Sequence, residues 1–174
     1  MKLIVVSDIH GKYVRLIELM EMHKDSDALI FLGDGLSDLT RADAYSYPFT
    51  VFAVRGNCDV QSFLVRNDAP TELATTFDTF KIYMLHGHTK NVKSGIDDAI
   101  LAANARKADV LLFGHTHEAK ETYLPEGTKI KNTVLHGPMH IFNPGSLGAS
   151  SDGKAHFGLI EIRGGQILTS LGTL

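Results

Sequence analysis

The chain opens with an apolar run, Leu3 to Val6, followed at once by Ser7-Asp8-Ile9-His10-Gly11. The run is typical of a buried strand, and Gly11 separates it from a helical pattern. Asp8 and His10 therefore lie where a first strand ends, which is where open α/β sheets keep their ligand sites. A carboxylate and an imidazole two residues apart can point to the same side and form half a metal site. An ordinary polar loop explains this motif about as well when it is taken alone.

Composition and length predict a single globular domain over residues 1–174, because 44% of the residues are hydrophobic and 21% are charged. The net charge of -3 shows no basic excess, so we do not expect bulk nucleic-acid binding. No apolar run approaches the length of a membrane span, and the N-terminus has no signal-peptide pattern. Cys58 is the only cysteine, which excludes an intrachain disulfide and fits a reducing compartment. We therefore expect a cytoplasmic protein without membrane contact.

The pattern of apolar residues predicts alternating strands and helices in the first half and mostly antiparallel strands in the last third. A tight turn is expected at Asn143-Pro144-Gly145-Ser146, and Gly164-Gly165 indicates a two-residue hairpin turn. The fold class expected from this order is α/β, with two packed sheets and helices outside them. The predicted helices are 13–23 and 96–107, with a short helix and loop within 37–48, and the predicted strands are 28–32, 50–54, 73–77, 81–85, 110–113, 122–124, 139–142, 156–163 and 166–171.

Metal-type ligands follow five of these strands, and each group lies next to a glycine. They are Asp8 and His10, Asp34, Asn57, His86, and His115 with His117. Thiolates are absent from the set, which argues against a structural zinc site of the cysteine type. Oxygen and imidazole donors of this kind suit manganese, iron or zinc.

Seven donors exceed what one catalytic metal with an open position needs, and they suit two metals that share a carboxylate, for which Asp34 is the candidate. A phosphodiester is negatively charged and repels hydroxide. Two cations about 3.5–4 Å apart can hold a hydroxide and neutralise the phosphoryl oxygens. The two aspartates neutralise only part of the charge of the two divalent ions, and the remaining positive charge favours an anionic substrate.

The ordered motifs resemble the calcineurin-like metallophosphoesterase superfamily. They are Asp8-Ile9-His10, Gly33-Asp34, Gly56-Asn57-Cys58-Asp59, His86-Gly87-His88 and Gly114-His115-Thr116-His117. The short length, the cysteine after Asn57 and the turn at 143–146 are similar to its YfcE-like branch of small phosphodiesterases. The resemblance implies a four-layer α/β/β/α sandwich of two mixed β-sheets flanked by helices, the metallo-dependent phosphatase fold, with a dinuclear site at its edge.

The resemblance also implies roles for individual residues. Asp8, His10, Asp34 and His117 would bind the first divalent metal. Asp34, Asn57, His86 and His115 would bind the second. Manganese is the first expectation for both, with iron, zinc and nickel as alternatives. A hydroxide bridging the two metals would attack phosphorus, and Asn57 would also touch a phosphoryl oxygen.

Cys58 stands where many superfamily members have a histidine that protonates the leaving group. A thiol is a poor substitute at neutral pH, so we expect weak activity on poor leaving groups and better activity on activated diesters. His88 is a candidate catalytic residue, either as the acid or as a phosphate contact. Cys58 itself is expected to be a small buried hydrophobe rather than a reactive thiol.

Other polar residues have ordinary structural explanations. We expect Asp59 to bond backbone or a ligand histidine. Arg55 either guides phosphate or forms a structural ion pair. Asn143 and Ser146 are expected to form the turn near the site. The remaining expectations are solvated charges or helix starts at Asp38, Asp97 and Asp98, and surface or satisfied core positions for His23, His136, His140 and His156.

Three functions compete at this stage. The first is hydrolysis of a small-molecule phosphodiester, and the second is hydrolysis of a phosphomonoester, including phosphoprotein. The third is a non-catalytic scaffold, as in a retromer subunit that resembles this branch, but such proteins have altered ligand positions. All seven positions are intact here, which favours catalysis. A homodimer or homotetramer could form through an exposed sheet edge.

Overall fold

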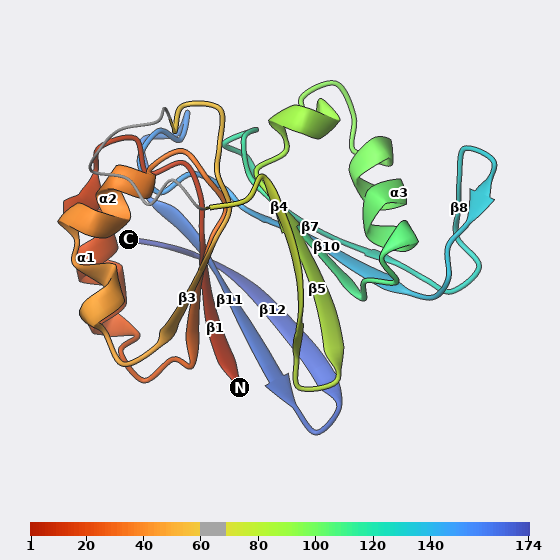
Figure 1. Ribbon diagram of the computed structural model, residues 1–174, viewed down its shortest axis with the longest axis horizontal. Coiled ribbons are helices and arrows are strands. Elements are labelled where there is room, and N and C mark those ends of the chain that lie inside the picture. The colour runs from red at the N-terminus through yellow and green to blue at the C-terminus, as the bar shows by residue number, and fades with distance from the viewer. Residues whose placement is uncertain (60–68) are drawn as a thin grey trace.

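Two five-stranded mixed sheets pack face to face, with helices on the outer side of each, in the computed structural model, which describes residues 1–59 and 69–174 (Figure 1). This arrangement confirms the α/β sandwich with outer helices that the sequence predicts. The region around Val60–Asp68 lies outside the described residues.

The first sheet has the order β12-β11-β1-β2-β3. Its parallel part consists of β1 (Lys2–Val6), β2 (Ala28–Phe31) and β3 (Thr50–Ala53), and β11 (His156–Arg163) joins β1 in antiparallel register. β12 (Gln166–Thr173) completes the predicted hairpin at one edge. Gly164 and Gly165 have φ values of 58° and 73°, the left-handed backbone that a type I′ turn requires at both central positions.

The second sheet has the order β4-β5-β6-β10-β7. β4 (Glu72–Phe77) and β5 (Phe80–Leu85) form the predicted hairpin, and β5 continues in parallel with β6 (Val110–Phe113). β10 (Met139–Pro144) pairs in parallel with β6 and antiparallel with β7 (Ala119–Leu124), so the last third is not purely antiparallel. β8 (Lys129–Ile130) and β9 (Thr133–Val134) form a small separate sheet, too short to leave a sequence pattern.

The predicted tight turn at 143–146 is wrong in its first half, because β10 continues through Asn143 and Pro144. Both residues pair with β7, and β6 accompanies β10 only as far as Phe142. Among the described strands, Pro144 therefore has no parallel neighbour that needs its missing N–H, which is how a sheet tolerates proline. The strand ends just before Gly145, which has a φ of 82° and whose N–H donates to the Asn143 side-chain oxygen at 2.9 Å.

The helices lie outside the sheets. α1 (Tyr13–Met22) and the short α2 (Leu36–Arg41) cover the first sheet, and α3 (Asp97–Ala105) covers the second (Figure 1). Two 3-10 turns, η1 (Ala44–Ser46) and η2 (His88–Lys90), complete the set. Among residues 1–59 and 69–174, no helix is long and apolar enough to span a bilayer.

Alternation along the strands divides the core into three layers of apolar side chains. Ile4 and Phe31 point from the first sheet toward α1 and α2, whereas Leu3 and Ile30 point toward the second sheet. On the far side, Leu111 packs beneath α3. Three apolar layers between four layers of secondary structure establish the predicted α/β/β/α sandwich.

The loop after β10 fixes the end of β1. Leu147 and Gly148 donate their N–H groups to the carbonyl oxygens of Ser7 and Asp8, each at 3.0 Å. A Cβ atom at Gly148 would lie 1.8 Å from the carbonyl oxygen of Ile9. Glycine therefore lets this loop approach the backbone of Asp8 closely.

We predict that Gly148→Ala lowers the free energy of unfolding by about 2 to 3 kcal/mol, because the backbone itself must move to relieve the overlap. Urea denaturation of the metal-free protein measures the change. Gly137→Ala is the control, since no atom of the described residues lies within 4 Å of a Cβ at Gly137. Equal stability of the two variants would contradict the close approach described here.

Candidate metal centre

The seven predicted donors lie at one end of the sandwich, where the parallel strands of both sheets finish. The ends of β1, β2 and β3 in the first sheet are followed by Asp8 with His10, by Asp34 and by Asn57. The second sheet supplies His86 after β5 and His115 with His117 after β6. The carboxyl ends of parallel strands meet at one edge, so residues far apart in sequence converge.

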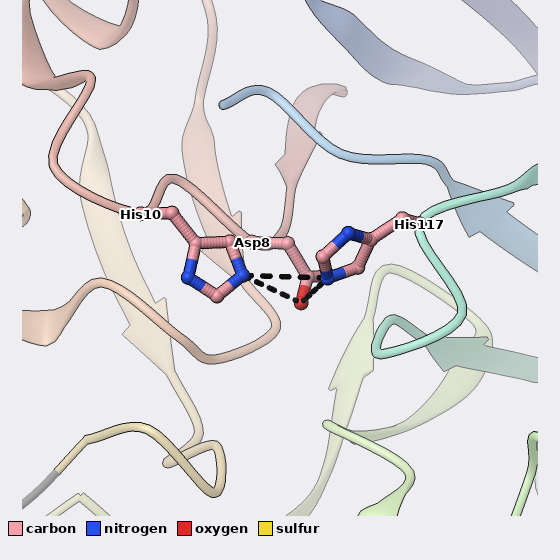
Figure 2. A group of neighbouring side chains, drawn as sticks. All are labelled: Asp8, His10 and His117. Atoms are coloured by element: carbon pink, nitrogen blue, oxygen red, sulfur yellow. Dashed lines mark hydrogen bonds and ion pairs between the residues drawn. The ribbon is translucent and has the colours of Figure 1, made fainter. Parts of the chain in front are cut away.

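Asp8, His10 and His117 form the first group (Figure 2). Asp8 Oδ1 lies 3.1 Å from His117 Nε2 and 3.7 Å from His10 Nε2, and the two Nε2 atoms are 3.3 Å apart. The carboxylate is fully buried, whereas the histidine side chains are 28% and 29% exposed. The group is therefore open toward solvent on its histidine side.

Asp34, His86 and His115 form the second group, and Asn57 adjoins it. His86 Nε2 lies 3.4 Å from Asp34 Oδ2, 3.1 Å from His115 Nδ1 and 3.1 Å from Asn57 Oδ1. Asp34 Oδ2 is also 3.9 Å from His10 Nε2 of the first group. The structure thus brings together all seven predicted donors, in two groups that meet at Asp34.

Two of the histidines are oriented by backbone carbonyls. Nδ1 of His86 lies 2.8 Å from the oxygen of Leu32, and Nδ1 of His117 lies 2.9 Å from the oxygen of Ala149. A carbonyl can only accept, so each Nδ1 carries the proton and each Nε2 is left to face the site. This is the usual arrangement of histidines that bind a metal.

Asp8 has one oxygen that is satisfied and one that is not. Oδ2 accepts hydrogen bonds from the Ser7 hydroxyl and the His115 N–H. Oδ1 is buried and receives no hydrogen bond from the described residues, although His117 Nε2 is close. A buried oxygen without a donor, facing imidazole nitrogens, fits a cation between them.

The profile of the calcineurin-like phosphoesterase superfamily domain matches residues 1–165. The chain belongs to this superfamily. YsnB of Bacillus subtilis, named a probable metallophosphoesterase, is 32% identical over 148 residues, covering 84% of this chain and 75% of YsnB. The phosphodiesterase YfcE of Escherichia coli K12 is 29% identical over 181 residues, covering 92% and 88% of the two chains. These relatives support the YfcE-like branch.

A crystal structure of a predicted phosphoesterase from Streptococcus pneumoniae has the same fold as this chain. The TM-score is 0.73 at 23% identity, with 99% of this chain and 88% of that chain covered. The likeness confirms the fold class. The superfamily membership supports phosphoester hydrolysis and divalent metal ions as cofactors.

The two aspartate carboxylates of the candidate site are held ionised by the groups around them. Burial raises the pKa of Asp34, but His86 and the Cys58 N–H lower it by more, so that the pKa falls to about 2. Burial acts on Asp8 in the same way, and His10 and His117 still lower the pKa of that carboxyl. Both aspartates are therefore negative at neutral pH.

The pKa values of the site histidines are shifted in opposite directions. Burial lowers the pKa of His86, yet the neighbouring Asp34 and Asp8 carboxylates leave it raised, and contact with Asp8 raises the pKa of His117. Burial and the charge of His86 lower the pKa of His115 to about 4. Without a metal ion, protons on His86 and His117 balance the two carboxylates, and a bound cation would displace them.

The Asp59 carboxylate accepts hydrogen bonds from backbone N–H groups, which confirms one of the two predicted alternatives. It accepts the N–H groups of Asp34 and Gly35 at 2.8 Å and those of Leu36 and Gly56 at 2.9 Å. Three of these four donors come from the loops after β2 and β3, and the fourth comes from the first residue of α2. Asp59 therefore fixes the two loops that carry Asp34 and Asn57.

Cys58 is exposed, so the expectation of a small buried hydrophobe is wrong. Its sulfur groups with Asp34 and His10, and Asn57 Nδ2 lies 3.2 Å from it. The residue sits on the loop after β3, which faces the open side of the site rather than the core. Burial by its neighbours and the charge of Asp34 raise the pKa of Cys58 to about 11, so it remains a thiol.

Asp38 is buried in the first turn of α2, so it starts a helix but is not a solvated charge. It accepts the Gly11 N–H at 2.8 Å and so supports the loop of His10. Ser146 is more than a turn residue, because its hydroxyl donates to the Asp8 carbonyl at 2.8 Å. Sequence reasoning missed Ser7, whose position directly before Asp8 was the one available signal.

We predict that Asp59→Ala lowers the free energy of unfolding by about 2 kcal/mol, because four N–H groups lose a charged acceptor. The Kd for Mn²⁺ should rise about 10- to 100-fold, since the loop of Asp34 loses its anchor. Urea denaturation and calorimetric titration measure the two effects. Glu126→Ala, which removes an exposed carboxylate between β7 and β8, should change neither. An Asp59→Ala protein with wild-type metal affinity would refute the anchoring role.

We also predict that Mn²⁺ binding weakens as pH falls from 8 to 6. His86 and His117 have raised pKa values, so they gain protons above the usual pH of 6.5 and must lose them to bind a metal. Titration calorimetry in buffers of different ionisation enthalpy counts the protons released. The exposed His136→Gln variant should show the same pH dependence as the wild type. Affinity that stays constant over this range, without proton release, would contradict the prediction.

Proposed function

We propose that this protein is a metal-dependent phosphodiesterase that hydrolyses a small phosphodiester at a centre of two divalent ions. The observation that carries the proposal is the meeting of two donor groups at Asp34, with Asp8, His10 and His117 on one side. His86, His115 and Asn57 would hold the ion on the other side. Manganese fits these oxygen and imidazole donors, and iron, zinc or nickel are alternatives.

When bound, two such ions would make hydroxide available from water at neutral pH and neutralise charge on the phosphoryl oxygens. The chain's own residues would supply orientation. Asp34 would set the spacing of the ions, and the carbonyls behind His86 and His117 would keep each Nε2 pointed inward. Asn57, which is exposed beside His86, would contact a phosphoryl oxygen as well as the second ion.

His88 is better suited to bind phosphate than to protonate a leaving group. Its ring lies 5.4 Å from that of His86 and 6.2 Å from that of His115, measured between centroids. Burial and the charge of His86 lower the pKa of His88, so it is mostly neutral at pH 7. Its buried Nδ1 has no partner among the described residues, and a neutral imidazole can still donate to a phosphoryl oxygen.

A preference for activated diesters is supported by two features, one for the class of ester and one for the leaving group. YfcE, which is 29% identical to this chain, is named a phosphodiesterase. In this chain Cys58 stays a thiol and His88 is mostly neutral, so neither offers a strong acid to a poor leaving group. We therefore propose that activated diesters are the better substrates.

We predict that Asp34→Asn lowers kcat/KM for bis(p-nitrophenyl) phosphate at least 1000-fold. The amide keeps an oxygen for the Cys58 N–H, which Asp34 Oδ1 now accepts at 2.7 Å, but removes the charge shared by both donor groups. Release of p-nitrophenol by the manganese-loaded protein is the measurement, and circular dichroism checks the fold. Asp97→Asn, on the exposed start of α3, should retain wild-type activity.

The same assay separates the competing functions. Faster hydrolysis of p-nitrophenyl phosphate than of the diester would replace the proposal with a phosphomonoesterase. A wild-type protein that takes up no divalent ion, even when it is supplied, would indicate a non-catalytic scaffold. Full activity of Asp34→Asn would refute the shared role of Asp34.

A further inference from the structure

A cavity of about 260 Å³ lies between the two loops of the second sheet that carry four site histidines. One wall comes from the segment after β5, where Val92 packs against Gly87 between His86 and His88. The other wall includes Thr116, which lies between His115 and His117 in the chain. Both walls therefore come from segments next to site histidines, and the cavity lies beside the loops of the candidate metal centre.

The lining combines apolar surface with positive charge. Val92 is buried and Ile96 half-buried, and they form an apolar face. Lys93 and Lys120 are exposed at the rim together with one acid, Glu118, so the cations are in excess. Lys93 directly follows Val92 in the chain, so its charge lies beside the segment that packs against Gly87.

We propose that this cavity receives one arm of the phosphoester substrate, and that this arm carries an anionic group of its own. The inference rests on the proposed hydrolytic function and extends it to a class of substrate. A cavity of about 150 Å³ can hold benzene, so 260 Å³ accommodates a substituted ring or a sugar. The apolar face would contact the ring, and Lys93 and Lys120 would contact the anion.

The expected size of the effect follows from the exposure of the lysines. Ion pairs at an exposed site contribute up to about 1 kcal/mol, which corresponds to about a fivefold preference for an anionic arm over a neutral one. The Debye length is about 10 Å at 0.1 M salt and shortens as ionic strength rises, so the preference should shrink as salt is added. A purely structural role of the lysines would produce neither effect.

The test uses two phosphonates of equal shape, 4-carboxybenzylphosphonate and 4-carbamoylbenzylphosphonate, whose P–C bond is not hydrolysed. Their Kd values for the manganese-loaded full chain are measured by calorimetry at 20 mM and 500 mM NaCl. The wild type should bind the carboxylate about fivefold more tightly at low salt and lose most of that preference at high salt. The double variant Lys93→Gln/Lys120→Gln should bind both compounds equally. Lys129→Gln, on β8 away from the cavity, should keep the wild-type preference.

Equal binding of the two compounds by the wild type, or an unchanged preference in the double variant, would overturn the inference. Hydrolysis of bis(p-nitrophenyl) phosphate by the same wild-type preparation distinguishes failure of the cavity as an anion site from failure of the proposed function. If the diester is hydrolysed but no preference is found, the proposed function stands and the cavity is not the anion site. If the diester is not hydrolysed, the proposed function fails, and the cavity as a substrate site fails with it.

Discussion

The buried carboxylate of Asp8 needs positive charge beside it, and the candidate metal centre is arranged around that need. Removing a carboxylate from water is costly unless it is paired or hydrogen-bonded. Ser7 and the His115 N–H serve one oxygen of Asp8, while the other faces the histidines and accepts no hydrogen bond from the described residues. Asp34, which follows the neighbouring strand β2, is also a buried carboxylate close to a histidine. Protonated histidines can balance these charges, and divalent ions can do so more completely.

The site is also a region of unusual backbone. Five of the seven donors have positive φ, between 45° and 68°, which costs on the order of 1 kcal/mol for each residue other than glycine. Backbone hydrogen bonds between loops hold this conformation, including the pairs from Asp8 N–H to the Gly33 oxygen and from Ile9 N–H to the Asp34 oxygen. The Asp59 carboxylate adds four more. Strain offset in this way is typical of positions retained for function rather than stability. The five donors are Asp8, His10, Asp34, His115 and His117.

Sequence alone indicated which residues would lie together, because each predicted donor follows an apolar run and lies close to a glycine, as His86 does after β5. It also predicted the sandwich, since the order of helix and strand patterns allows few alternatives. It could not predict the exposure of Cys58 or the burial of Asp38, because these depend on which way a loop turns after its strand. The continuation of β10 through Pro144 was missed for a similar reason, as it depends on where the neighbouring β6 ends.

The donors are divided unequally between the two sheets. Both carboxylates come from the first sheet, and three of the four histidines in the two groups come from the second. Neither sheet holds all of these residues by itself, so an ion bound by both groups would be captured only after the two sheets have packed together. An ion bound there would link the two sheets at one edge of the sandwich. Removing it with a chelator would weaken the contact between the sheets before it affected either sheet.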